Sequence, residues 1–66
     1  MGWLVDSRII LSKLLTDGWV EVARAGSHLQ MKHPAKPGRV TLPHPRRDIP
    51  IGTVKSIEKQ SGLKLK

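Results

Sequence analysis

The chain opens with a hydrophobic pattern that has the period of a helix. Its apolar side chains recur three and four positions apart and would form one stripe, made of Ile10, Leu11, Leu14 and Leu15. Asp6 or Ser7 can cap the N-terminus of such a helix, and Gly18 stands where a left-handed residue often ends one. The pattern therefore predicts a helix over residues 7–17.

After this helix the period changes to two, which is typical of a strand. The alternation predicts that Val20 and Val22 lie on a buried face and that Glu21 lies on the opposite one. Residues 25–27 follow as a tight hairpin turn, in which Gly26 supplies a positive φ if the turn needs one.

The central strand is predicted over residues 28–33, and its two faces differ in chemistry. One face carries His28, Gln30 and Lys32, and the other carries Leu29 and Met31. The same alternation places His33 on the apolar side. Residues 34–38 contain two prolines and one glycine, so we expect them to form a loop.

A third short strand is predicted over residues 39–42, with Val40 and Leu42 as its apolar pair. Pro43 ends this strand because proline cannot donate to a ladder. Residues 43–48 then form a stiff, basic connector that leads into a second helix.

The second helix is predicted from residue 51 or 52 to residue 60, with Pro50 compatible with its first turn. Its inward positions would be Ile51, Val54 and Ile57. Gly62 is expected just past its end, with Leu63 packing back on the helix. Residues 64–66 are expected to fray.

These elements predict an α+β fold in the order α-β-β-β-α, a three-stranded antiparallel sheet with two helices on one face. Val20, Val22, Leu29, Met31, Val40 and Leu42 would be buried between them. The other face would stay open and carry Glu21, His28, Gln30, Lys32, Arg39 and Thr41. We expect one domain over residues 1–66, with its core at about 7–63.

The charge balance indicates a polyanionic partner. Twelve Lys and Arg against five Asp and Glu leave a net charge of +7 on 66 residues. Phe and Tyr are absent, and Trp19 is interpreted as a core residue, so nucleic acid would be held through phosphates rather than by stacking. No apolar run is long enough to span a bilayer and there is no cysteine, which together favour a cytoplasmic protein.

His28 is the strongest candidate for chemistry, because it stands beside a turn glycine and a hydroxyl and points away from the apolar face. An imidazole suits proton transfer, since its ordinary pKa lies near working pH. Lys32, on the same face, is expected to contact a phosphate. Three scattered histidines and few carboxylates offer no metal-ligand set, so we expect neither a metal nor another cofactor.

Several short motifs, taken in order, resemble HicA-type toxins, the small mRNA interferases of HicA–HicB toxin–antitoxin modules. They are Asp17-Gly18-Trp19, Gly26-Ser27-His28, His33-Pro34, Val40-Thr41-Leu42-Pro43-His44-Pro45, Ile49-Pro50-Ile51-Gly52-Thr53-Val54 and Ile57-Glu58-Lys59-Gln60-Ser61-Gly62-Leu63. The resemblance covers roughly residues 7–63. It departs from the family mainly at residues 1–5, a longer lead into the first helix.

The resemblance implies a fold similar to a double-stranded-RNA-binding domain and a metal-independent endoribonuclease. Such a toxin would cleave mRNA, inhibit translation and be neutralised by a HicB-type antitoxin. The essential histidine of the family follows a Gly-Ser pair, so it corresponds to His28. RNA contacts are expected from Gly26, Ser27, Lys32, Arg46 and Arg47.

Two other functions fit the same residues. A non-catalytic RNA-binding module of this fold would use basic residues of the second helix, where Lys55 and Lys59 lie, and would need no histidine. A protein-interaction domain would use its basic surface to bind an acidic partner and would show no affinity for RNA.

A second catalytic group is not evident in the sequence. His33 and His44 would need the fold to bring them near His28 before either can act with it.

Overall fold

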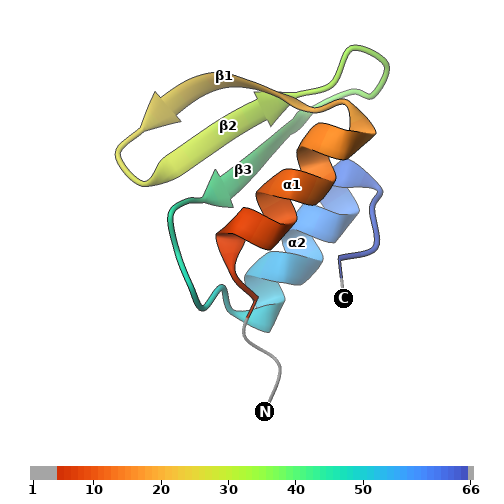
Figure 1. Cartoon of the computed structure of the whole chain (residues 1–66). Helices are drawn as coiled ribbons and strands as arrows, with labels where there is room; N and C mark the ends of the chain where they lie inside the picture. The colour runs from red at the N-terminus through yellow and green to blue at the C-terminus, as the bar shows by residue number, and fades with distance from the viewer. Residues whose placement is uncertain (1–4, 66) are drawn as a thin grey trace.

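A computed structural model of the chain describes residues 5–65 and confirms the α-β-β-β-α fold (Figure 1). In chain order its elements are α1 (Ser7–Asp17), β1 (Val20–Ala25), β2 (His28–Lys32), β3 (Arg39–Pro43) and α2 (Ile51–Ser61). The strands form one antiparallel sheet in the order β1-β2-β3, and both helices lie against the same face of it. The predicted order and pairing are therefore confirmed.

The core lies between this face of the sheet and the two helices. Its buried side chains are Ile10, Leu14, Trp19, Leu29, Met31, Val40, Leu42, Ile49, Val54, Ile57 and Leu65. Val5 forms an isolated antiparallel bridge with Ile49, which ties the start of the described chain to the segment before α2.

The helix ends follow the local chemistry of the sequence. The Asp6 carboxylate caps α1 by accepting the Arg8 backbone N–H at 2.9 Å. Gly18 ends α1 in the left-handed region, at φ 107°, and Gly62 ends α2 in the same way, at φ 75°. Because glycine has no Cβ, both helices stop at these residues without steric cost.

The prediction that Val20 and Val22 are buried was wrong. Their exposed fractions are 52% and 48%, and Val20 pairs with Lys32 on the open face of the sheet. Glu21 pairs with Met31 instead, so it lies on the helix side rather than the predicted open side, and a bulge follows it. The helices lie under β2 and β3 and leave the edge strand β1 uncovered (Figure 1), so burial does not decide which face its valines take.

Two predicted inward positions of the helices are partly exposed. Leu15 is 52% exposed because α1 packs through Ile10 and Leu14. Ile51 is 37% exposed because it stands in the first turn of α2.

The predicted fraying after α2 was wrong for Leu65. This side chain is buried, and its backbone N–H donates to Glu58 Oε2 at 2.7 Å.

Two further expectations concern the start of the chain and a membrane-spanning segment. The predicted apolar lead lies almost wholly at residues 1–4, outside the described residues. Within the described residues, no helix is long and apolar enough to cross a membrane.

Candidate functional site

A two-residue turn presents the candidate site at one end of the sheet. β1 ends at Ala25 and β2 begins at His28, so Gly26 and Ser27 alone connect the strands. Gly26 has φ 60°, the positive value that a type II′ hairpin turn needs at its first position. A Cβ built on Gly26 would meet no atom within 4 Å, so the space next to this turn glycine is open.

His28 is exposed at the first position of β2. Ala25 pairs with it on one side and Pro43 on the other, so its ring stands on the open face of the sheet, as predicted. Within residues 5–65 neither of its nitrogens has a hydrogen-bond or ion-pair partner. The imidazole is therefore free to exchange protons with a ligand.

The connector after β3 anchors the turn. The His44 backbone N–H donates to the carbonyl of Ser27 at 2.8 Å, directly before His28. His44 Nδ1 lies 2.8 Å from the hydroxyl of Ser7, which also accepts the Arg46 N–H at 2.8 Å. Ser7 is fully buried at the start of α1, so this hydroxyl ties the connector to the helix.

The backbone of His44 lies next to the residue before His28, but the two imidazole rings point to different sides of the sheet. The ring of His44 points to Ser7 on the helix side, whereas that of His28 stands on the open face. The peptide bond that follows His44, to Pro45, is cis. The sequence indicated Ser7 only as a possible helix cap, because its partners lie 37 and 39 positions away.

His33, at the other end of β2, is fully engaged in structure. Its Nδ1 accepts the Ala35 N–H at 2.9 Å, so Nε2 carries the proton and donates to the Asp17 carbonyl at 2.7 Å. The ring also packs edge-on against Trp19, with centroids 5.4 Å apart. His33 therefore joins the end of α1 to the loop after β2 and is not available to the candidate site.

The open face carries the remaining polar positions of the sheet. Lys32 pairs with Arg39, and Gln30 pairs with Thr41. The Arg39 guanidinium donates to Gln30 Oε1 at 2.6 Å. Because Glu21 lies on the other side, the strand residues paired across this face include no carboxylate.

Arg46 and Arg47, predicted as RNA contacts, are exposed in the connector. Arg46 lies 3.6 Å from the carboxylate of Asp48.

At the start of α1, the hydrogen bond from Arg8, together with its charge and a smaller contribution from Arg47, lowers the pKa of Asp6 to about 2. Arg24 was not predicted, but its guanidinium donates to the His44 carbonyl at 3.4 Å, so it contacts the connector from β1.

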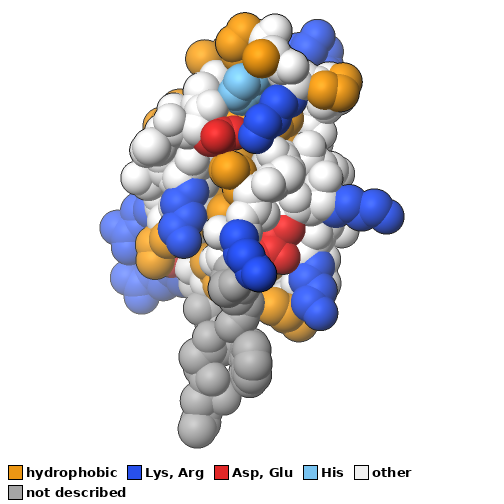
Figure 2. Space-filling model, turned by 90° about the vertical axis from the view of Figure 1, so that its right-hand side faces the viewer, with side chains coloured by type: hydrophobic (Ala, Val, Ile, Leu, Met, Phe, Trp, Pro, Cys, Tyr) orange, Lys and Arg blue, Asp and Glu red, His pale blue; other side chains and the backbone are white. Residues whose placement is uncertain are grey.

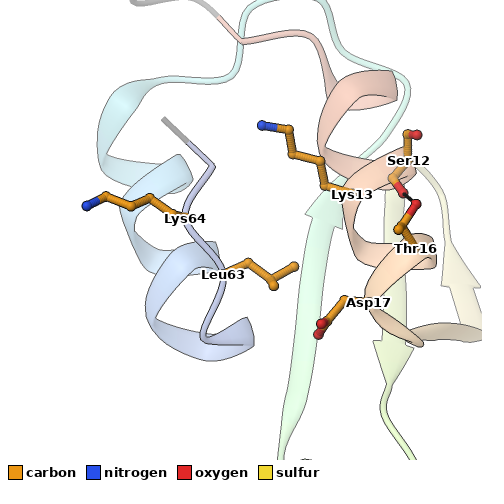
Figure 3. A pocket seen from close by; sticks show the side chains of 6 residues that line it. All are labelled: Ser12, Lys13, Thr16, Asp17, Leu63 and Lys64. Atoms are coloured by element: carbon orange, nitrogen blue, oxygen red, sulfur yellow. Dashed lines mark hydrogen bonds between the residues drawn. The ribbon is translucent and has the colours of Figure 1, made fainter.

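A separate hollow of about 340 Å³ lies between α1 and the segment after α2 (Figure 3). The hollow is lined by Ser12, Lys13, Thr16, Asp17, Leu63 and Lys64. None of these was a predicted site residue.

On the surface shown in Figure 2, Lys and Arg side chains are widely spread, with few acidic groups between them. The described residues contain no group of three or more potential metal ligands.

Comparison with known proteins agrees with the motifs in the sequence. A family model described as the HicA toxin of bacterial toxin–antitoxin systems matches residues 7–63, which includes every described helix and strand. No curated protein sequence matches the chain.

Proposed function

Because the chain belongs to the HicA toxin family of toxin–antitoxin systems, we propose that it is a metal-independent endoribonuclease that cleaves mRNA and inhibits translation. His28 acts in this proposal as the general acid or base. A HicB-type antitoxin protein neutralises the enzyme by covering the surface that holds His28.

The observation that carries this proposal is the difference between the three histidines. His33 uses both ring nitrogens within the fold, and His44 uses Nδ1 on Ser7. His28 is exposed beside an open turn and has no partner in the described chain. A residue that moves a proton to or from a substrate needs this freedom.

The reaction needs only groups of RNA and of the protein. The 2′-oxygen loses its proton to a base and attacks the adjacent phosphorus, and the bond from phosphorus to the 5′-oxygen breaks. The leaving oxygen takes up a proton, so the products carry a 2′,3′-cyclic phosphate and a 5′-hydroxyl. His28 serves one of these two proton transfers, each of which contributes about 10²–10⁴-fold to a rate.

The turn supplies positioning groups for the same phosphate. Ser27 has an exposed hydroxyl directly before His28, and Gly26 allows the RNA backbone to approach closely. The connector holds the Ser27 carbonyl, so it limits movement of the turn when RNA binds. Arg46 and Arg47 are exposed in the same connector, and their positive charge stabilises the charge on the phosphoryl oxygens.

Expression of the chain beside His28→Ala tests the proposal. Growth and mRNA integrity are followed in cells, and cleavage of RNA by purified protein is followed in the presence of EDTA. The parent should arrest growth and release 2′,3′-cyclic phosphate ends, and His28→Ala should do neither. Thr41→Ala, exposed on the same face of the sheet, is the matched control and should retain activity.

Two results would contradict the proposal. Equal cleavage by His28→Ala would remove this histidine from the mechanism. If the folded parent bound RNA without cutting it, the alternative of a non-catalytic RNA-binding module would be favoured. The exposed Lys55 and Lys59 of α2 would then be the first residues to test.

A further inference from the structure

Lys32 and Arg39 form a like-charged pair directly across two neighbouring strands. From this pair we infer a second phosphate site on the open face of the sheet, which holds single-stranded RNA at a phosphate away from the one at His28. The inference rests on the proposed ribonuclease function and extends it to the path of the substrate.

The pair lacks the compensation that four other cations of the described residues receive. Arg8, Arg24, Lys36 and Arg46 each have a carboxylate oxygen within 4 Å. Within the described chain Lys32 and Arg39 have none, and no carboxylate is paired across their face. Like charges directly opposite each other destabilise a sheet, so a bound anion would relieve this repulsion.

Arg39 is also held in place for a ligand. Its Nη1 donates to Gln30 Oε1 at 2.6 Å, which holds the guanidinium beside Gln30, on the His28 side of Lys32 along β2. Arginine in a fixed orientation offers several N–H donors to phosphate oxygens, and Lys32 adds a second positive charge. The combination suits one phosphate group or two successive ones.

The spacing along β2 connects this site to His28. Lys32 lies four residues from His28 on the same face, or roughly 13 Å along the strand. That span is longer than the distance between successive phosphates of a single strand, so a short stretch of RNA can reach both points. An RNA strand that follows β2 would therefore place one phosphate at the turn and another between Lys32 and Arg39.

The character of the face favours RNA backbone over a protein partner. Its apolar side chains are small or half-exposed, namely Val20, Ala23, Ala25 and Pro43, while the aromatic Trp19 is buried. Protein interfaces concentrate their energy in large aromatic or arginine anchors that fill pockets. This face presents cations beside small or half-exposed apolar side chains, so it suits phosphate contacts without base stacking.

The test measures binding without cleavage. Lys32→Gln/Arg39→Gln is made in the His28→Ala background, and binding to a labelled single-stranded RNA of about ten nucleotides is followed by anisotropy over a range of salt. Affinity should fall at least tenfold, and the slope of log affinity against log salt should decrease by about 0.7 for each phosphate that the variant no longer binds. Lys13→Gln/Lys64→Gln, at the separate hollow, is the matched control and should leave the slope unchanged.

A charge reversal gives an independent measurement. Lys32→Glu would place a carboxylate opposite Arg39, so it should raise the melting temperature of the free protein while it weakens RNA binding. A substitution that only damaged the fold would lower both. A melting temperature that falls with the affinity would therefore overturn the inference.

The remaining outcomes separate the inference from the proposed function. Unchanged RNA affinity and salt slope in the double variant would overturn the second phosphate site, and loss of binding to the HicB-type antitoxin alone would reassign the pair to a protein contact. If the parent chain cleaves no RNA but still binds it through Lys32 and Arg39, the proposed nuclease fails and the binding site is supported.

Discussion

His28 and His33 stand at opposite ends of β2, and the fold uses them in opposite ways. His28 is exposed, lies on the open face and has no partner in the described chain. The His33 side chain is only 11% exposed and bonds at both ring nitrogens to the segments on either side of it. One end of the strand is therefore built for stability, and the other is left free for a ligand.

The comparison shows how a small chain can separate these two tasks. Protein stability of roughly 0.05–0.15 kcal/mol per residue would give a chain of this length only about 3–10 kcal/mol. The His33 end joins α1, β2 and the following loop through side chains, while the His28 end is held mainly through the backbone of Ser27. Substitutions that affect one end should therefore leave the other property largely unchanged.

The largest effect on stability is expected from His33→Ala. The change removes two hydrogen bonds and the edge-on contact with Trp19, and it should lower the free energy of unfolding by about 2–4 kcal/mol. Urea denaturation measures the loss. His28→Ala is the matched control, and its free energy of unfolding should stay within about 0.5 kcal/mol of the parent. An equal loss in both variants would contradict the proposed difference between the two ends of β2.

Gly18→Ala should be next, because it damages the His33 end without removing the histidine. At φ 107° a side chain is strained, and the new Cβ would lie 2.8 Å from His33 Nε2. A loss of about 1–3 kcal/mol is expected by the same denaturation measurement. Gly52→Ala, in α2 with open space around it, should be neutral or stabilising, and a comparable loss there would contradict the steric explanation.

Ser7→Ala tests His44. Within the described residues His44 bonds through one ring nitrogen, whereas His33 bonds through both and His28 through neither. The change leaves the Arg46 N–H without its acceptor and frees His44, which should cost about 1–2 kcal/mol in the free energy of unfolding. RNA cleavage per folded molecule should also fall severalfold, because the connector holds Ser27 beside His28. Ser12→Ala, exposed on the same helix, should change neither quantity.

The smallest effect concerns the acid dependence of stability at the His33 end. The hydrogen bond and charge of Lys36, at 2.6 Å, lower the pKa of Asp17 below its ordinary value near 3.8. A lowered folded-state pKa gives stability that is present above this ordinary value and is lost as the pH falls through the folded-state pKa. The melting temperature of Lys36→Met should lie slightly below that of the parent near neutral pH, and the gap should narrow in acid.

Lys32→Met provides the control for that titration. Its lysine has no carboxylate partner within residues 5–65, so any difference in melting temperature from the parent should stay nearly constant as the pH falls. A narrowing gap in both variants would mean that Asp17 is not the group responsible.

The sequence alone predicted the features that depend on near neighbours. Helical and alternating periods determined the order of the five elements, and glycines at the helix ends determined where α1 and α2 stop. The same alternation placed His28 on the open face, opposite Leu29 and Met31. These features follow from contacts within a few residues, so a short stretch of sequence contains the information for them.

The tertiary structure decided the features that depend on distant partners. It left the edge strand β1 uncovered, buried Leu65, and assigned His33 to Asp17 and His44 to Ser7, residues 16 and 37 positions apart. It also placed Lys32 opposite Arg39 and removed Glu21 from their face. Strand register and helix coverage arise only when the whole core packs, so periodicity along the chain could not distinguish a free histidine from a bound one.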